Sequence, residues 1–422
     1  MPTTTTRRRA TRIWILLGLI LLTVNLRAAI TCTGPLLTDI QHTRHLTGLQ
    51  LSILTTLPVL CLGAFAAWVP ALARRTGTEP AITGALLLIA VGITLRGLPY
   101  TTALFAGTII AGAGIATGNV LVPAVVKERF AHQIGRATGL AMTLMASSGA
   151  VAAGIAVPVG RLAGWQAAMA VWAAPAAAGA ALWAVLATRH HGIGFGTQRP
   201  AVGRPEGSLL RSPLAWAVAT FLGIVSLMFY ALAAWLPEIM QADGYSKTTA
   251  GAMVSVMLTL GIPMGYVMPV IAARLPQQQP LVLALAAIKI TSLAGILTMP
   301  SLAWMWVCIL GLATGSAFPL AMTLLTLRSP NPAVAARLSG MAQTFGYLLA
   351  GTGPATLGLL HTLTGTWQIP LLLLLALVVP ETAAGLVAAR PLLVDEPLPL
   401  RPPFDAAEAA TPGRGNVGSG LS

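Results

Sequence analysis

Apolar runs long enough to cross a lipid bilayer recur twelve times along this chain of 422 residues. A transmembrane helix needs roughly 20 apolar residues to cross about 30 Å of hydrocarbon. Apolar residues make up 56% of the chain and charged residues only 9%, which leaves more apolar surface than a water-soluble domain can bury. The sequence therefore predicts an all-α integral membrane protein in the lipid bilayer, with spans near residues 13–35, 48–72, 81–98, 101–126, 137–161, 165–188, 213–238, 248–273, 280–299, 302–327, 338–361 and 366–389.

The first span follows four arginines within residues 1–12, an arrangement that resembles the start of a signal peptide. Its apolar run is too long for a signal peptide, and no small-residue cleavage site follows it. We expect this segment to be retained as the first helix.

The net charge of +14 is distributed unevenly between the two sides of the predicted membrane. If the N-terminus is cytoplasmic and the spans alternate, nineteen of the 25 lysines and arginines fall on the cytoplasmic side. This positive-inside bias predicts an inner (plasma) membrane protein with both termini in the cytoplasm. The basic residues lie in separate short loops and form no single face, so we do not expect nucleic acid as a partner.

A polar stretch over residues 189–212 divides the chain into two sets of six spans, 13–188 and 213–390. It holds Gly, Pro and Arg without a helical apolar period, as expected for a linker. The tail, 391–422, is rich in Pro, Gly and Ala and is expected to be disordered.

The two halves repeat each other at an offset of about 200 residues, through four short matches in the same order. Two parallel six-helix repeats are a known transporter design, with the solute bound at their interface near the bilayer midplane. A membrane sensor that binds a solute without moving it is the alternative, but a sensor needs no symmetric pair of gates. The matches pair residues 48–54 with 251–257, 70–75 with 269–274, 116–123 with 313–319, and 136–143 with 337–344.

Arg27 is the most costly residue to place, because it lies inside the first span. It follows Arg12 by about 22 Å along a helix that rises 1.5 Å per residue, too deep for its charge to reach the cytoplasm easily. A central arginine costs about 2.5–3.5 kcal/mol to insert. It either faces a water-filled cavity and binds an anion through its planar donors, or is paired with a carboxylate or with helix-end carbonyls.

Five other residues are candidates for solute binding. Asn119 is an amide inside span 4, able to bond a solute or to tie two helices together, and Asn25 is an amide inside span 1, rotated away from the helix face of Arg27. Tyr230 and Tyr347 are aromatic candidates for the cavity wall in spans 7 and 11. Arg96 lies in span 3 at a depth similar to that of Arg27, and either faces the cavity or reaches the lipid headgroups.

Lys289 and Glu381 each lie about nine residues from the inner end of their spans, 9 and 12. Equal depth predicts a buried ion pair, which would be structural. A proton-coupling role for Glu381 is the alternative.

No pattern in the sequence indicates an enzyme, a metal site or a cofactor. There is no HExxH, no P-loop and no metal-site spacing among the six histidines, and the three cysteines all sit in apolar segments. The absence of a P-loop argues against ATP-driven transport by this chain, so uphill transport would depend on an ion gradient or a partner, with protons as the candidate coupling ion. We expect a monomer.

Two stretches resemble the cyanate permease and 2-nitroimidazole transporter subgroup of the major facilitator superfamily. They are residues 25–37, which read NLRAAITCTGPLL, and residues 118–127, which read GNVLVPAVVK. The resemblance covers the chain from span 1 to span 12. It implies a fold of two six-helix bundles, alternating access, and a cavity lined by spans 1, 4, 7 and 10.

Two features depart from the superfamily pattern. Arg74 stands where the loop after span 2 usually has an acidic residue, and span 5 lacks the Gly-Pro step of antiporters. The second departure weakens the interpretation of the chain as a drug-efflux protein.

With Arg27 as the principal polar contact, we expect a secondary transporter of a small polar or anionic solute, cyanate-like or nitroimidazole-like. A drug:proton antiporter and a non-transporting sensor are the alternatives.

Overall fold

The computed structural model describes the backbone of residues 4–189 and 209–394, and the side chains of 13–188 and 209–394. Most of the predicted linker and nearly all of the predicted tail lie outside the described residues. Candidate spans, identified by length and composition alone, number ten among the described helices, which makes this a multi-pass membrane protein.

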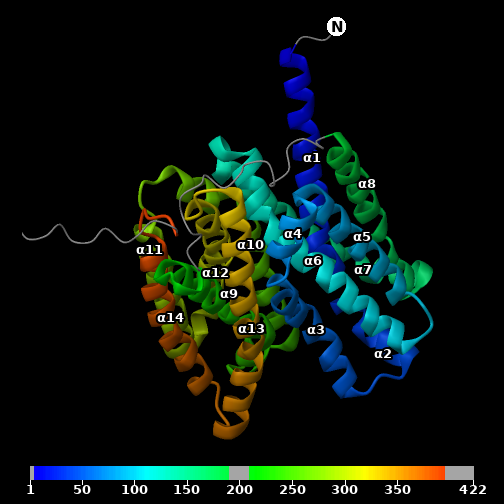
Figure 1. Cartoon of the computed structure of the whole chain (residues 1–422). Coiled ribbons are helices and arrows are strands. Elements are labelled where there is room, and N and C mark those ends of the chain that lie inside the picture. Colours follow the sequence, from blue (N-terminus) through cyan, green and yellow to red (C-terminus); the bar gives the residue numbers. More distant parts are fainter. Residues whose placement is uncertain (1–3, 190–208, 395–422) are drawn as a thin grey trace, which may run out of the picture.

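Twelve helices of 17 residues or more account for nearly all of the described chain (Figure 1). In chain order each covers most of one predicted span, although α7, Ile134–Ala170, also includes residues 165–170, predicted as the start of the next span. No strand occurs among the described residues, so the prediction of an all-α fold is confirmed. Two short helices, α2 and α4, lie between long ones. The helices are α1 Thr4–Thr31, α2 Leu37–Arg44, α3 Gly48–Ala66, α4 Val69–Thr76, α5 Thr78–Arg96, α6 Thr101–Arg129, α7 Ile134–Ala170, α8 Ala173–Arg189, α9 Pro213–Ala242, α10 Lys247–Arg274, α11 Gln279–Thr298, α12 Ala303–Leu327, α13 Pro332–Thr364 and α14 Gln368–Ala388, with 3₁₀ turns at Gly34–Leu36, Ala131–Gln133, Leu209–Arg211 and Pro300–Leu302.

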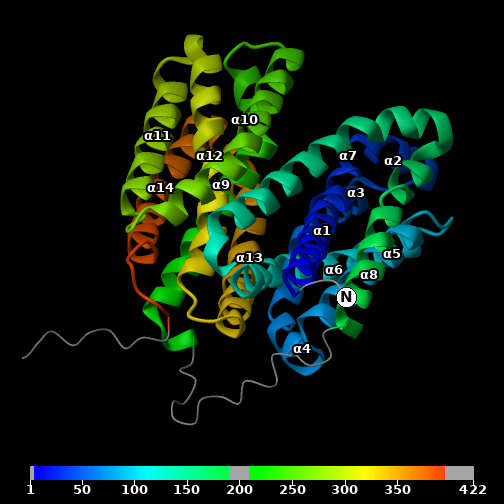
Figure 2. The ribbon, with the colours of Figure 1, turned by 90° about the horizontal axis from the view of Figure 1, so that it is seen from above.

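The long helices form two bundles, α1 to α8 and α9 to α14, referred to as the N-terminal and C-terminal bundles (Figure 2). The end of the molecule where α8 finishes and α9 begins is called the linker end, and the end that carries α2 is called the opposite end. In Figure 2 the bundles meet toward the linker end and diverge toward the opposite end.

The apolar core follows the same division. One continuous cluster of buried residues runs through the N-terminal bundle and into the linker-end half of the C-terminal bundle. The opposite-end half of the C-terminal bundle packs around a second, separate cluster. The bundles therefore share a core only toward the linker end.

Local sequence explains where α9 and α13 begin. In both cases a capping residue precedes a proline at the first helical position, as Ser212-Pro213 and Asn331-Pro332. The Ser212 hydroxyl accepts the backbone N–H of Ala215 at 3.3 Å, and the Asn331 side chain accepts that of Val334 at 2.9 Å. These caps fix the register of the two helices that supply most of the candidate site.

The repeat explains how the bundles approach each other at the linker end. Gly139 on α7 and Gly340 on α13 match in the repeat, and each lies against a backbone carbonyl of the other bundle. A methyl group built at Gly139 would lie 2.9 Å from the oxygen of Tyr266, and one at Gly340 would lie 3.0 Å from that of Ala66. The two carbonyl oxygens belong to residues that lie three and four positions before the matched prolines, Pro269 and Pro70. The matched motifs thus build two similar closing contacts.

The α13 helix is absent from the ten candidate spans although it has 33 residues. Its polar residues lower its hydropathy, among them Gln343, Thr344 and His361. It packs chiefly on α9 and also contacts α3 and α6 of the other bundle. Its composition therefore fits a helix set between the bundles.

Candidate functional site

Arg27 points from α1 across the interface between the bundles. Its guanidinium carbon lies 5.9 Å from the centroid of the Phe229 ring, on α9 of the C-terminal bundle. The side chain is half-buried, and no carboxylate lies within ion-pair distance of it among the residues whose side chains are described. A cation over an aromatic ring contributes about 0.5–1 kcal/mol where exposed and about 2 kcal/mol where desolvated.

The absence of a side chain at Gly149 on α7 leaves room for the stem of Arg27 on α1. A methyl group built at Gly149 would lie 2.8 Å from Cγ of Arg27, so a larger residue there would displace the arginine stem. The Thr31 hydroxyl lies 3.0 Å from the carbonyl oxygen of Gly149 and 3.1 Å from that of Arg27, and donates to one of them at a time. The two helices are thus joined beside the guanidinium.

Aromatic rings of the C-terminal bundle complete this cluster. The rings of Phe229 and Tyr230 meet edge to face, 5.5 Å between centroids. Tyr347 on α13 is only 3% exposed, and its phenol is close enough to Arg27 and Tyr230 to interact electrostatically with both. We call Arg27, Phe229, Tyr230 and Tyr347 the inter-bundle site. It combines one cation with rings on two helices of the other bundle, an arrangement suited to a planar or anionic solute.

The hydrogen bonds of the two predicted amide residues involve groups outside this cluster. The Asn25 side chain donates to the carbonyl of Leu21 at 2.7 Å, and its Oδ1 is buried without a partner. Asn119 is 4% exposed, and its backbone carbonyl accepts a hydrogen bond from Gln343 of the other bundle at 3.1 Å. Asn119 therefore lies at the bundle interface through its backbone, whereas Asn25 bonds within its own helix.

Arg96 is 2% exposed and does not reach the lipid-facing surface. Its Nη1 donates to the carbonyl of Ala29 at 2.8 Å and its Nη2 to the hydroxyl of Thr33 at 2.8 Å. The guanidinium thus satisfies carbonyl and hydroxyl oxygens where α1 ends. These contacts hold Arg96 inside the N-terminal bundle, away from Phe229.

Lys289 and Glu381 form an ion pair between α11 and α14, with 2.6 Å between Nζ and Oε1. Both side chains are buried, at 1% and 5% exposure, and Oε2 of Glu381 has no partner. The pair lies wholly within the C-terminal bundle.

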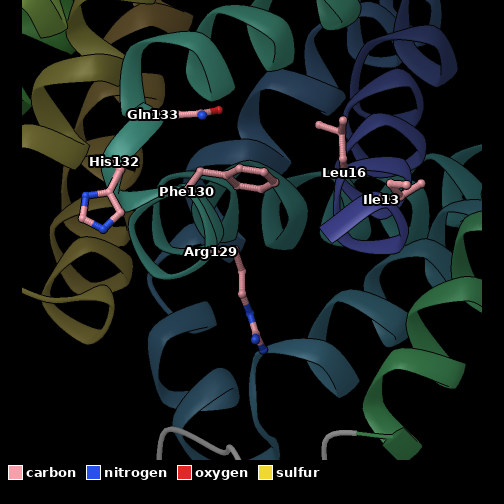
Figure 3. Close-up of a pocket in the computed structure, with 6 residues that line it drawn as sticks. All are labelled: Ile13, Leu16, Arg129, Phe130, His132 and Gln133. Carbon is pink, nitrogen blue, oxygen red and sulfur yellow. The ribbon is translucent and has the colours of Figure 1, made fainter. Parts of the chain in front are cut away.

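A surface pocket lies elsewhere, at the linker end of the N-terminal bundle (Figure 3). Arg129 borders it, but its side chain extends away from Phe130 and His132 and pairs with Glu79 at 2.5 Å. Glu79, in the first turn of α5, thus supplies a carboxylate shortly after α4, in which Arg74 replaces the usual acid. Arg129 is already neutralised and one bundle supplies every lining residue, so this pocket differs from the inter-bundle site, which joins residues of both bundles. The lining residues are Ile13, Leu16, Arg129, Phe130, His132 and Gln133.

Sequence reasoning missed two residues at the interface, Phe229 and Gln343. Phe229 stands about 200 residues after Arg27, so the repeat offset could have identified it as the counterpart of the arginine. Gln343 matches Met142 in the repeat, and a glutamine within an apolar helix was the available signal. No group of three or more His, Cys, Asp or Glu with metal-binding geometry occurs in the described part of the chain.

A family model and several known transporters match most of this chain. The family model described as Major Facilitator Superfamily matches residues 19–354. An uncharacterized transporter of Bacillus subtilis is 37% identical over 89% of this chain and 94% of its own length. The 2-nitroimidazole transporter of Escherichia coli is 34% identical over 90% of this chain and 96% of its own length. The cyanate transport protein of the same organism is 29% identical over 84% and 91%.

The fold also matches a solved structure, the proton:xylose symporter XylE, with a TM-score of 0.70 at 14% identity over 90% of this chain and 95% of that one. The subgroup resemblance carried by residues 25–37 and 118–127 is confirmed by the relatives named above. The chain therefore belongs to the major facilitator superfamily, and it is a solute transporter of two six-helix bundles and not an enzyme, as its sequence predicted.

Proposed function

We propose that this transporter carries a small planar or anionic solute between its bundles by alternating access, with Arg27 as the principal polar contact. One observation carries the proposal: Arg27 has no carboxylate partner among the described side chains and faces Phe229 of the other bundle. A guanidinium offers a planar fork of donors to an anion or a nitro group. Two relatives are named for such compounds, cyanate and 2-nitroimidazole.

The proposed orientation has the linker end in the cytoplasm, because basic residues gather there. Arg74 and Arg75 end α4, Lys127 and Arg129 end α6, and Arg274 ends α10. With the bundles joined at that end and diverging at the other, the chain is in an outward-facing arrangement in the inner membrane. We expect a monomer, because one chain supplies both bundles.

Proton coupling is part of the proposal and rests on Glu381. Its Oε1 holds Lys289 while its Oε2 is unpartnered, so this oxygen is free to take a proton. Uptake into proteoliposomes under an imposed pH gradient, with Glu381→Gln beside the parent, tests this part. An equal response of both proteins would exclude Glu381 as the coupling group.

The main test uses purified protein with cyanate and 2-nitroimidazole as separate probes. A bound solute raises the unfolding temperature by mass action, in whichever direction transport runs. We expect at least one probe to stabilise the parent protein and to show saturable, counterflow-competent flux in proteoliposomes. Stabilisation that persists equally in Arg27→Ala would remove Arg27 from the site.

A further inference from the structure

Gln343 joins the two bundles through a buried hydrogen bond. Its Nε2 lies 3.1 Å from the carbonyl oxygen of Asn119, on α6 of the N-terminal bundle, and 2.8 Å from the hydroxyl of Ser339 on its own helix. The Gln343 side chain is 1% exposed. Both distances are those of ordinary hydrogen bonds.

The acceptor is a carbonyl that its own helix cannot satisfy. In α6 the oxygen of Asn119 would normally accept the N–H of the residue four positions later, which is Pro123. Proline has no N–H, so this carbonyl loses its helical partner. Gln343 supplies the missing donor from the other bundle.

Gln343 also stands between the closing contact and the inter-bundle site. Gly340, which packs against Ala66, lies three residues before it on α13, and Tyr347 lies four residues after it. Residues three and four apart share a helix face, so the three positions are aligned toward the N-terminal bundle. A parting of the bundles at the linker end would separate Gln343 from Asn119.

The repeat shows that packing alone does not require an amide here. Met142 occupies the matching position of α7, and the matched proline of α12, Pro319, is retained. The Oε1 atom of Gln343 is buried without a partner, which is unfavourable. Methionine would fill a similar volume without that penalty. The amide is therefore explained by its donor to Asn119.

We propose that Gln343 is a positioning residue for transport, whose hydrogen bond to the Asn119 carbonyl holds the linker end closed while the bundles diverge at the opposite end. The bond forms in the outward-facing arrangement and is lost when the linker end opens. This role is independent of the solute that the inter-bundle site carries, and its test requires no substrate.

The test measures opening of the linker end with a cysteine reporter. Ala273 faces Gly135 across the other closing interface, with its Cβ 2.7 Å from a methyl group built at Gly135. Ala273→Cys is introduced after Cys32, Cys61 and Cys308 are replaced by alanine. A membrane-impermeant maleimide is then applied from the linker-end side. We expect Gln343→Met to raise the labelling rate roughly two- to tenfold, the factor that one ordinary hydrogen bond gives.

Thr344→Val is the matched control. The Thr344 hydroxyl is also buried on α13, but it makes no hydrogen bond, so its removal should leave labelling unchanged. Labelling of Gln343→Met at the parent rate would overturn the proposal. An equal rise in Thr344→Val would do the same, because it would show a general loosening of α13.

Gln343→Glu keeps the test decisive if the methionine variant does not fold. Burial and the Asn119 carbonyl both favour the neutral carboxyl, so the comparison extends to about pH 10. An ionised glutamate cannot donate to the Asn119 carbonyl, so labelling relative to the parent at the same pH should rise as the pH rises. In acid, the protonated carboxyl can donate, and labelling should return toward the parent rate measured at the same pH. Parent-like labelling of Gln343→Glu over the whole range up to about pH 10 would show that the donor is unnecessary and would end the proposal.

Discussion

The guanidinium of Arg27 and the ring of Phe229 face each other across the two bundles at 5.9 Å, from positions about 200 residues apart in a chain that repeats at that offset. Internal duplication thus places a cation in one half opposite an aromatic ring in the other. The two residues differ in chemistry, so the site itself is asymmetric although the bundles match. Predictions about solute recognition follow from that asymmetry.

Arg27→Ala should abolish saturable flux of the probe solutes while the protein still inserts and folds. The substitution removes the only cation of the inter-bundle site and no ion pair that the described residues show. Proteoliposome uptake of cyanate and 2-nitroimidazole is the measurement. Arg27→Lys should fail as well, because a point charge cannot reproduce the planar fork. Full flux in the lysine variant would show that charge alone is sufficient.

Phe229→Leu should raise KM roughly two- to fivefold, since it removes a cation–π contact but keeps apolar volume. Phe229→Tyr keeps the ring and serves as the control, with a KM near that of the parent. Initial rates of probe uptake over a range of probe concentrations give the KM of each variant. A similar rise in both variants would indicate that the ring's shape matters and its interaction with Arg27 does not.

Arg96→Met should reduce stability without changing KM. The side chain is buried and bonds the carbonyl of Ala29 and the hydroxyl of Thr33 where α1 ends. Loss of these partners is expected to cost about 1–3 kcal/mol. Thermal unfolding in detergent and uptake kinetics distinguish the two effects. A raised KM with unchanged stability would instead move Arg96 into the solute site.

Lys289→Ala should destabilise the protein by about 3–5 kcal/mol, because it leaves Glu381 charged and buried. The double variant Lys289→Met with Glu381→Leu should recover most of that loss, since replacing a whole buried pair with apolar residues is often neutral. Unfolding in detergent at one pH compares the parent, single and double variants. A double variant as unstable as the single one would contradict a simple ion pair.

Gly139→Ala and Gly340→Ala should each prevent tight closure of the linker end. The methyl group added at Gly139 would lie 2.9 Å from the carbonyl oxygen of Tyr266, and the one added at Gly340 would lie 2.8 Å from Cγ of Pro70, both closer than real side chains come. We expect faster cysteine labelling from the linker-end side and slower transport in both variants. Gly154→Ala, where nothing lies within 4 Å, is the control. A strong effect at only one of the two positions would show that the repeat does not close symmetrically.

The architecture could be predicted from the sequence because the sequence signals of a membrane bundle are local or periodic. Span length and hydropathy predicted the long helices, and the offset of the repeat predicted two bundles. Depth along a span could also be counted from its ends, which is why Lys289 and Glu381 could be expected to meet.

The direction that a side chain takes around its helix could not be predicted in the same way. Arg27 and Arg96 have similar predicted depths, yet one faces the other bundle and the other bonds the end of α1. Asn25 is only two residues from Arg27 and points to a different side, because successive residues turn by about 100°. The repeat offset and an amide in an apolar helix could mark Phe229 and Gln343 as candidates, but their roles depend on which face of α9 or α13 meets the other half.

The polar composition of α13 has a consequence for biogenesis. A segment of low hydropathy enters the bilayer poorly by itself, so its integration depends on helices already in place. The α9 helix is the partner available, because it precedes α13 in synthesis and meets it through Gly223 and Gly346. In nascent chains truncated before α13, α9 should therefore be integrated in the membrane. An isolated α13 fused to a reporter should instead be translocated without integrating.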